Sequence, residues 1–295
     1  MGSQHNPALP VEVEREIFEW TAISYPRAIP RLLRVARRVQ LWVEPYLYRI
    51  VQIGPTPPYS IMQQTTKPAS FYRDAVRHLY LPHTPPFDWS PKILEMCTGT
   101  RNFTATGGSP GPALIPILLQ MDLRQLSLYL GYLFGGHQNI NLKHPLFSSI
   151  THLDVFDDIP ENDPQISPHL AALPALTHLA LNHDVPPRLF REILSDCSKL
   201  QVLVNLWDSD SASFGRFLAH NPPVADPRFV ISEYKDYRLE WVASARGEPD
   251  FWSVAEDFIF RKRSGAIPQH CYWMDYWMDD DMTPDQQEGN DEDDM

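Results

Sequence analysis

A short apolar pattern returns along the middle of the chain every 23 to 27 residues, and this periodicity restricts the fold more than any other feature. Five clear copies align at one leucine each, and a weaker copy at Arg101–Thr104 divides the longest interval into steps of 24 and 23. A last copy, Phe229–Ile231, fits if Val230 is the aligned position. Internal repetition at this period indicates a repeat architecture. The aligned leucines are Leu79, Leu126, Leu153, Leu179 and Leu203.

A stretch with apolar residues at helical spacing precedes the strand-like copies. One short strand and one helix in each 20 to 29 residues is typical of leucine-rich repeats. A single repeat cannot bury its apolar face, so stacked neighbours must supply the core. Residues 71–232 therefore predict a leucine-rich-repeat-like α/β solenoid, with Cys97 and Cys197 as small core residues at helix ends rather than reactive thiols. The expected helices are 90–96, 111–121, 167–172 and 187–196.

Side chains alternate between the two faces of a strand, so the residue before each aligned leucine points away from the core. We expect these positions, and others on the same face, to form an open concave surface that binds a protein target, because aromatic and hydrogen-bonding groups suit protein recognition. The predicted target-binding residues are His78, Tyr80, Gln125, Tyr129, His152, Asp154, Phe156, His178 and Asn182.

Chemistry-bearing motifs are scarce. The sequence lacks a phosphate-binding glycine loop, a nucleophile elbow and a His-Glu-x-x-His motif, so we expect neither an enzyme nor a cofactor. One alternative stays open. His152 and His178 are expected on adjacent strands about 5 Å apart. Together with Asp154 they could form a metal site or the site of an unfamiliar enzyme.

The N-terminal residues 7–53 predict a small helical unit, followed by a linker at 54–70. A first amphipathic helix is expected to begin near Pro10, and a second to run from Leu32 with an arginine face and end at Pro45. Five glutamates in the same unit offset the arginines, so a solvated helix face is favoured over nucleic-acid binding.

The C-terminal part changes character twice. Residues 233–268 are aromatic and non-periodic, which predicts a cap on the last repeat. Residues 269–295 predict a largely disordered tail, in which the aromatic cluster Cys271–Met278 docks on the cap or serves as a linear motif. Ten acidic residues fall in 275–295, so the rest of the chain has a net charge of only −2. Three dispersed cysteines and no long apolar stretch predict a protein of the cytoplasm or nucleus, without a membrane partner.

The N-terminal unit resembles an F-box in the segments Leu9–Phe18, Leu32–Arg38, Trp42 and Tyr46–Tyr48. It is similar to the F-box-like proteins of mushroom-forming fungi, in which such a unit precedes degenerate leucine-rich repeats. The resemblance implies an α/β fold in which a helical F-box-like unit is followed by a solenoid, and the composition adds the acidic tail. It also implies docking on the Skp-type adaptor of a cullin-RING ubiquitin ligase through Leu9, Pro10, Ile17, Phe18, Leu32, Leu33, Val35 and Val39.

Two functional hypotheses follow. In the first, the chain is a substrate receptor of such a ligase and its repeats hold an unknown protein target. In the second, it is a non-catalytic repeat scaffold whose helical unit packs on its own repeats as a cap. Exposed apolar surface on the helical unit favours the first.

Overall fold

The repeated segments form neighbouring strands of one parallel sheet. The structure is a computed structural model that describes residues 9–54, 57–63, 67–83, 91–107, 111–158, 166–182 and 185–274. Within these residues the sheet has nine strands, and each pairs in parallel with the next along the chain. The strands are β1 (Ile50–Gln52), β2 (His78–Leu81), β3 (Asn102–Ala105), β4 (Gln125–Leu128), β5 (His152–Val155), β6 (His178–Asn182), β7 (Val202–Asp208), β8 (Phe229–Tyr234) and β9 (Trp273–Met274).

The strand register follows the sequence alignment from β2 to β7. Leu79, Phe103, Leu126, Leu153, Leu179 and Leu203 face one another across successive strands, and all are fully buried. The alignment of the last copy was wrong by one residue, because Leu203 pairs with Phe229 and not with Val230. A shift of one residue exchanges the two faces of a strand. Phe229 accordingly joins the main core, while Val230 packs on the opposite side of the sheet.

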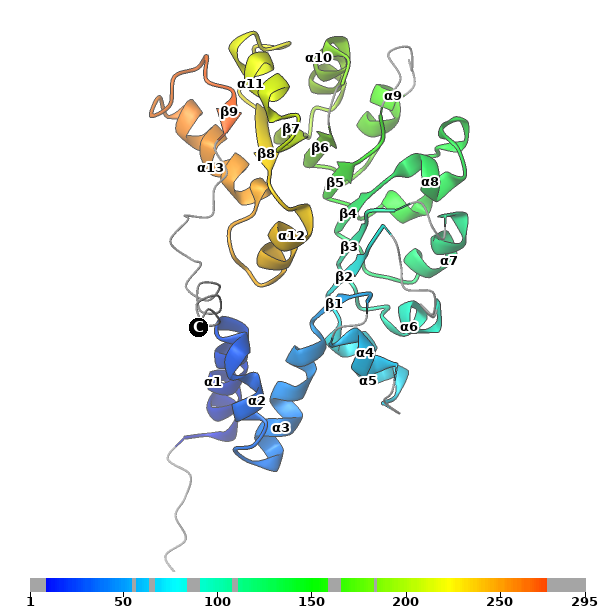
Figure 1. Cartoon of the computed structure of the whole chain (residues 1–295), viewed down its shortest axis with the longest axis vertical. Helices are drawn as coiled ribbons and strands as arrows, with labels where there is room; N and C mark the ends of the chain where they lie inside the picture. Colours follow the sequence, from blue (N-terminus) through cyan, green and yellow to red (C-terminus); the bar gives the residue numbers. More distant parts are fainter. Residues whose placement is uncertain are drawn as a thin grey trace, which may run out of the picture.

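Short helices cover the leucine-bearing face of the sheet and enclose the main core with it. Figure 1 shows them along the outside of the curved sheet. Cys97 and Cys197 are buried at the ends of two of these helices, as predicted, and burial raises the pKa of their thiols to about 12 and about 11. The helical elements on or beside this face are α4 (Tyr59–Met62), α5 (Ala69–Ala75), α6 (Pro91–Met96), η3 (Gly111–Leu114), α7 (Ile115–Leu118), α8 (Leu130–Phe134), η4 (His137–Asn139), η5 (Pro145–Phe147), α9 (Ile166–Ala171), α10 (Pro187–Asp196) and α11 (Ala212–His220).

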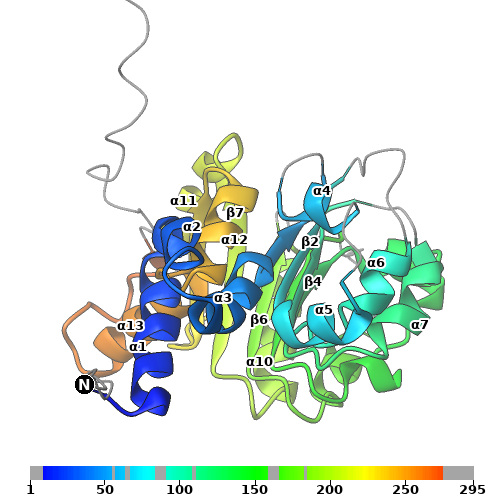
Figure 2. The same cartoon turned by 90° about the horizontal axis from the view of Figure 1, so that it is seen from below.

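Two further helices, α12 (Tyr237–Ala245) and α13 (Phe251–Arg263), lie on the opposite, concave face of the sheet (Figures 1 and 2). In the α13 interface, Trp252 and Ile259 pack with Val204 and Val230. In the α12 interface, Trp241 packs with Tyr80. Residues 233–268 were expected to cap the last repeat, and their aromatic side chains also bury outward-facing side chains of earlier strands, among them Tyr80 and His178.

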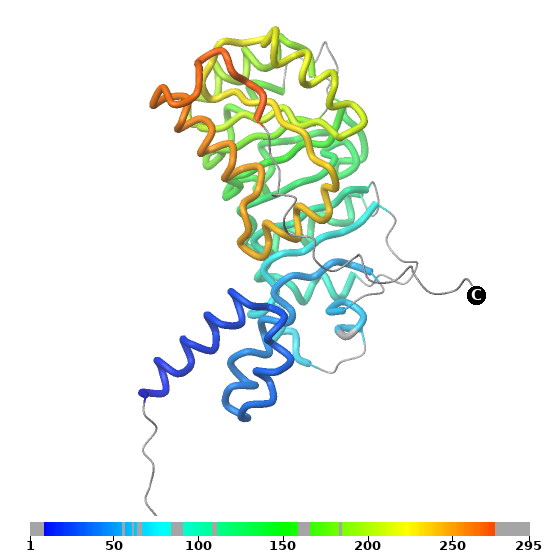
Figure 3. The backbone as a smooth tube through the Cα atoms, turned by 60° about the vertical axis from the view of Figure 1, so that its left-hand side comes forward, coloured from blue at the N-terminus to red at the C-terminus, as the bar shows by residue number. Residues whose placement is uncertain are grey.

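The N-terminal helices project from the β1 end of the sheet (Figure 3). The first helix begins next to Pro10, as expected, but the arginine-faced helix is broken into two pieces by a turn at 33–35. Ile50–Gln52, assigned to the helical unit on sequence, is instead the first strand of the sheet. The elements are α1 (Val11–Ser24), η1 (Pro26–Ala28), α2 (Ile29–Leu32), α3 (Arg37–Val43) and η2 (Glu44–Tyr48).

The two segments expected to lack structure are partly ordered. In the predicted linker 54–70, Tyr59 and Met62 of α4 are buried in the main core. At the C-terminus, Trp273 and Met274 pair with Ile231 and Ser232 of β8, so this part of the expected tail extends the sheet. Residues 275–295, with the acidic run and the rest of the aromatic cluster, lie outside the described residues. Where the chain is described, it contains no helix with the length and apolar character needed to cross a bilayer.

Candidate functional site

The nine predicted target-binding residues lie on the concave side of the sheet, but they do not form one open surface. His178, Asp154 and Asn182 are buried, and His78 and His152 are largely covered. The cover is provided by α12 and α13, which sequence reasoning had placed elsewhere. The strand face under these helices carries polar side chains, and buried polar groups need hydrogen-bond partners. Most of them have such partners.

The two central histidines stack on each other. The rings of His152 and His178 lie 4.1 Å apart with an angle of 11° between their planes, and the Trp252 ring stands nearly perpendicular to both. The Nδ1 atoms are 2.9 Å and 2.8 Å from the hydroxyls of Thr151 and Thr177. Burial lowers the pKa of both imidazoles, to about 4 for His152. The pair is therefore held neutral at physiological pH.

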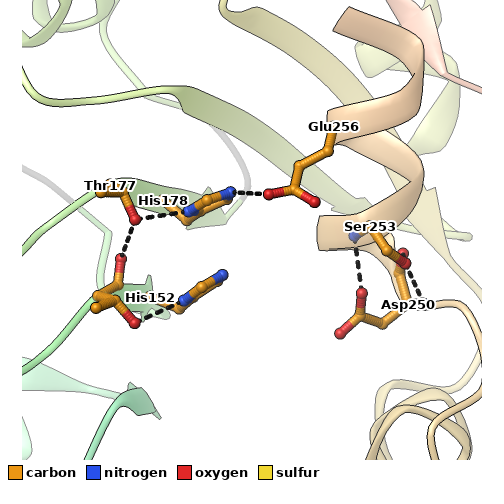
Figure 4. A network of polar contacts seen from close by, with 7 residues as sticks. His152, Thr177, His178, Asp250, Ser253 and Glu256 are labelled. Carbon is orange, nitrogen blue, oxygen red and sulfur yellow. Dashed lines mark hydrogen bonds and ion pairs between the residues drawn. The ribbon is translucent and has the colours of Figure 1, made fainter. Parts of the chain in front are cut away.

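Glu256 reaches this pair from α13 (Figure 4), and its carboxylate lies 3.0 Å from Nε2 of His178. In the same figure, Asp250 caps α13 through the backbone N–H of Ser253. Throughout the described residues, no group of three or more His, Cys, Asp and Glu side chains is arranged to hold a metal ion. Asp154, the third residue of the alternative set with His152 and His178, is hydrogen-bonded to Asn182 and Tyr237.

Asp154 is fully buried and accepts hydrogen bonds from two side chains. The Asn182 amide donates at 2.7 Å, and the Tyr237 hydroxyl donates at 2.7 Å from the first turn of α12. Burial raises the pKa of Asp154 to about 7, against the lowering effect of these two donors. The carboxyl thus anchors α12 and offers no oxygen to an incoming target.

His78 has a comparable position beneath Trp241. Its ring lies 6.5 Å from the indole, and its Nδ1 is buried without a hydrogen-bond partner among the described residues. Burial lowers the pKa of His78 to about 4, and the charges of Arg49 and Arg77 act in the same direction. The imidazole is therefore neutral, and its role here is packing.

The other predicted residues surround two hollows. Gln125 and His152 line a small cavity beneath α12, of about 30 Å³, which has room for little more than a water molecule. Glu240 also lines it, and burial raises the pKa of that carboxyl to about 7. This cavity is too small for a target side chain.

A larger hollow opens at the carboxyl edge of the sheet, and we call it the rim basin. Its volume of about 310 Å³ reaches the lower end of the range for ligand sites, roughly 300 to 1,000 Å³. Four of the nine predicted residues, Tyr80, Tyr129, Phe156 and Asn182, come together here. The rim basin is lined by Tyr80, Thr106, Tyr129, Phe156, Asn182, Tyr234, Asp236, Tyr237 and Arg238.

Sequence reasoning missed five of the nine lining residues. Tyr234 was recognised only as part of an aromatic, non-periodic segment. Asp236, Tyr237 and Arg238 were not singled out. The strand period does not reach past Tyr234. The available signal was the density of aromatic residues after β8, but it does not say which face of the sheet they join.

The predicted adaptor-docking residues divide into exposed and internal ones. Val39 is completely buried in the core of the N-terminal helices, so it is not part of any docking face. Phe18, Leu32 and Leu33 are half-buried against that same core. Leu9, Pro10, Ile17 and Val35 are exposed to solvent.

Further apolar residues extend this exposed strip. Trp20 is 64% exposed and Ile17 49% exposed, and both line a shallow groove along α1 with Val13 and Tyr25. The sequence placed Val13, Ile17 and Trp20 on one helix face, but that face points to solvent rather than to a core.

The sequence matches no model of a known protein family and shows no significant similarity to any curated protein.

Proposed function

We propose that the chain is a non-catalytic substrate receptor of a cullin-RING ubiquitin ligase, with an F-box-like N-terminal unit that docks on a Skp-type adaptor and leucine-rich-repeat-like turns that hold a protein target. The observation that carries the proposal is the exposed apolar strip on α1. A helical unit that only capped its own repeats would turn this strip inward, because exposed apolar side chains gain free energy when buried.

The size of the strip is consistent with a partner. Val11, Val13, Ile17 and Trp20 of α1 are each between 39% and 64% exposed, and Val35, in the turn between α2 and α3, is 58% exposed. Burying a large apolar side chain is worth about 1.5 to 3 kcal/mol, so such a strip supplies several kcal/mol before association costs are subtracted. Few monomeric proteins leave such a surface uncovered.

The arrangement of the sheet supports the repeat half of the proposal. From β1 to β8 the strands pair in sequence order and are connected by helices on one face, which is what a leucine-rich-repeat-like solenoid requires. The target then contacts the rim basin, since α12 and α13 occupy the centre of the concave face.

The second candidate, a capped scaffold without ligase association, also has an observation in its favour. The η2 segment packs against the repeats: Tyr48 contacts Phe71 and Tyr72 of α5, with ring centroids 5.3 Å and 5.6 Å apart. This contact fixes the root of the helical unit and leaves the α1 strip free, so it is compatible with both candidates.

Co-purification with a Skp-type adaptor tests the proposal. Ile17→Asp and Val35→Asp change exposed positions, so they should abolish adaptor binding while the chain stays folded. Phe214→Asp is the matched control, because Phe214 is 66% exposed on the remote helix α11 and should leave binding intact. If wild type does not bind the adaptor at micromolar concentration, or if both variants bind it as wild type does, the ligase assignment is wrong and the scaffold remains.

A further inference from the structure

The rim basin is built around a chain of aromatic rings that runs along the carboxyl ends of the strands. Tyr129 lies 5.4 Å from Phe156, Phe156 lies 5.1 Å from Tyr237, and Tyr237 lies 5.6 Å from Tyr234, each pair in an edge-to-face arrangement. Such packing holds the rings rigid, and the faces of aromatic rings carry partial negative charge. Rigid tyrosines bind a partner at low entropic cost.

Carboxylates lie near these rings. Asp236 lines the basin at the start of α12, and Asp208 pairs with Tyr234 in the sheet register. Asp158, two positions after Phe156, is exposed, whereas the Asp157 carboxylate is buried and accepts hydrogen bonds from the backbone N–H groups of Leu130 and Gly131. Their charge acts on the rings: the pKa of Tyr129 is raised mainly by burial and further by Tyr132, Asp157 and Asp158.

The basic group of the lining is turned to one side. Arg238 donates a hydrogen bond from Nη1 to Oε1 of Gln52, 3.2 Å away on β1. Its charge is thereby placed toward β1, whereas Asp158 follows β5 and Asp208 ends β7. Asp236 lines the basin, and Asp208 and Asp158 add negative charge near Tyr234 and Tyr129, so charge complementarity favours a cation.

We propose that the rim basin receives an arginine or lysine side chain from a segment of the protein target. Ring faces attract a cation within about 6 Å of the centroid. A planar guanidinium also stacks on tyrosine and pairs with carboxylates in two-point contacts. This inference rests on the proposed function for the statement that the ligand is a target, but the basin's preference for a cation stands on its lining alone.

Binding of peptides to the full chain tests the inference. The probes are fluorescent seven-residue peptide pools with random flanks and a fixed central arginine, lysine, citrulline or glutamate, measured by fluorescence anisotropy. The arginine and lysine pools should bind at least tenfold more tightly than the citrulline pool, in which the charge is removed and the shape kept. Equal binding of arginine and citrulline pools, or no binding by any pool, would overturn the inference.

Free N-acetyl-argininamide separates a peptide ligand from a small organic cation. If it binds as tightly as the arginine pool, the basin is a small-molecule site and the assignment to a target segment is wrong. Tighter binding of the glutamate pool would show that the basin prefers an anionic side chain, and would overturn the inference.

Variants locate the binding. Tyr129→Leu should weaken arginine-pool binding several-fold, and Tyr129→Phe, which keeps the ring, should not. Asp236→Asn should also weaken it, since asparagine preserves the helix cap while removing the charge. Arg238→Gln should strengthen it. Asp122→Asn, an exposed carboxylate just before β4 at the opposite edge of the sheet, is the matched control and should have no effect.

The same variants distinguish this inference from the proposed function. Adaptor co-purification depends on α1 and should be unchanged in Tyr129→Leu. If the wild-type chain binds the arginine peptides but not the adaptor, only the ligase assignment is contradicted. Retained adaptor binding without a charge preference in the peptides contradicts only the basin assignment.

Discussion

The hydroxyl of Tyr237 donates a hydrogen bond to the buried carboxyl of Asp154 over 2.7 Å, joining two residues that are 83 positions apart in the chain. This contact fixes the first turn of α12 to the middle strand of the sheet. Asp154 was predicted to face a target, but in the structure it holds α12 against the sheet.

Removal of this hydroxyl should destabilise the fold. In Tyr237→Phe the buried Asp154 loses a donor, which costs about 1 to 3 kcal/mol because the carboxyl oxygen remains desolvated. Urea unfolding measures the change. Tyr132→Phe is the control, since Tyr132 is exposed and its substitution should alter the free energy of unfolding by less than about 0.5 kcal/mol. Equal effects of the two changes would contradict the anchoring role.

Asp154 should also make stability depend on pH. Burial raises its pKa to about 7 in the folded chain, whereas the unfolded value is about 3.9. Between these values only the folded chain holds the proton, so this group lowers the free energy of unfolding as pH rises from about 4 to about 7, by at most about 1.4 kcal/mol per pH unit. Relative to wild type, Asp154→Asn should gain stability across this range. If the free energies of unfolding of wild type and Asp154→Asn change in parallel with pH, Asp154 does not titrate as described.

His152 should make the free energy of unfolding depend on pH in the opposite direction. Burial lowers the pKa of His152 to about 4, below the unfolded value of about 6.5. As pH falls through this interval the unfolded chain takes up a proton that the folded chain refuses, so stability is lost. His152→Gln should lose less stability than wild type between pH 6.5 and 4.5. His270→Gln, at an exposed position, should follow the wild-type profile.

The cover of the concave face should depend on Trp252. Its ring is 8% exposed and contacts both histidines, so Trp252→Ala should cost about 3 to 5 kcal/mol. Phe260→Ala changes a residue of the same helix that is 68% exposed, and should cost less than about 0.5 kcal/mol. Chemical denaturation distinguishes the two, and hydrogen exchange should show increased opening of β5 and β6 in Trp252→Ala only. Similar costs for both would mean that α13 does not cover the sheet as described.

The sequence by itself determined the local pattern of the sheet. The repeat placed the strands at Leu79, Leu126, Leu153, Leu179 and Leu203 and assigned one face of each to the core, because apolar alternation and period are local properties. It also indicated an N-terminal helix with an apolar face. Only its last alignment, at Phe229, slipped by one residue.

Only the tertiary structure decided what covers the other face. Strand alternation points Asp154, His152 and His178 away from the leucine core. It does not determine whether the face that carries them is exposed to solvent or covered. Their burial results from contacts with Tyr237 and Trp252, which lie far along the chain. Side-chain pairing over such separations depends on the position of whole helices, and a local pattern does not contain that information. The same long-range packing gathers tyrosines from β2, β8, α12 and the junction of β4 with α8 around the rim basin.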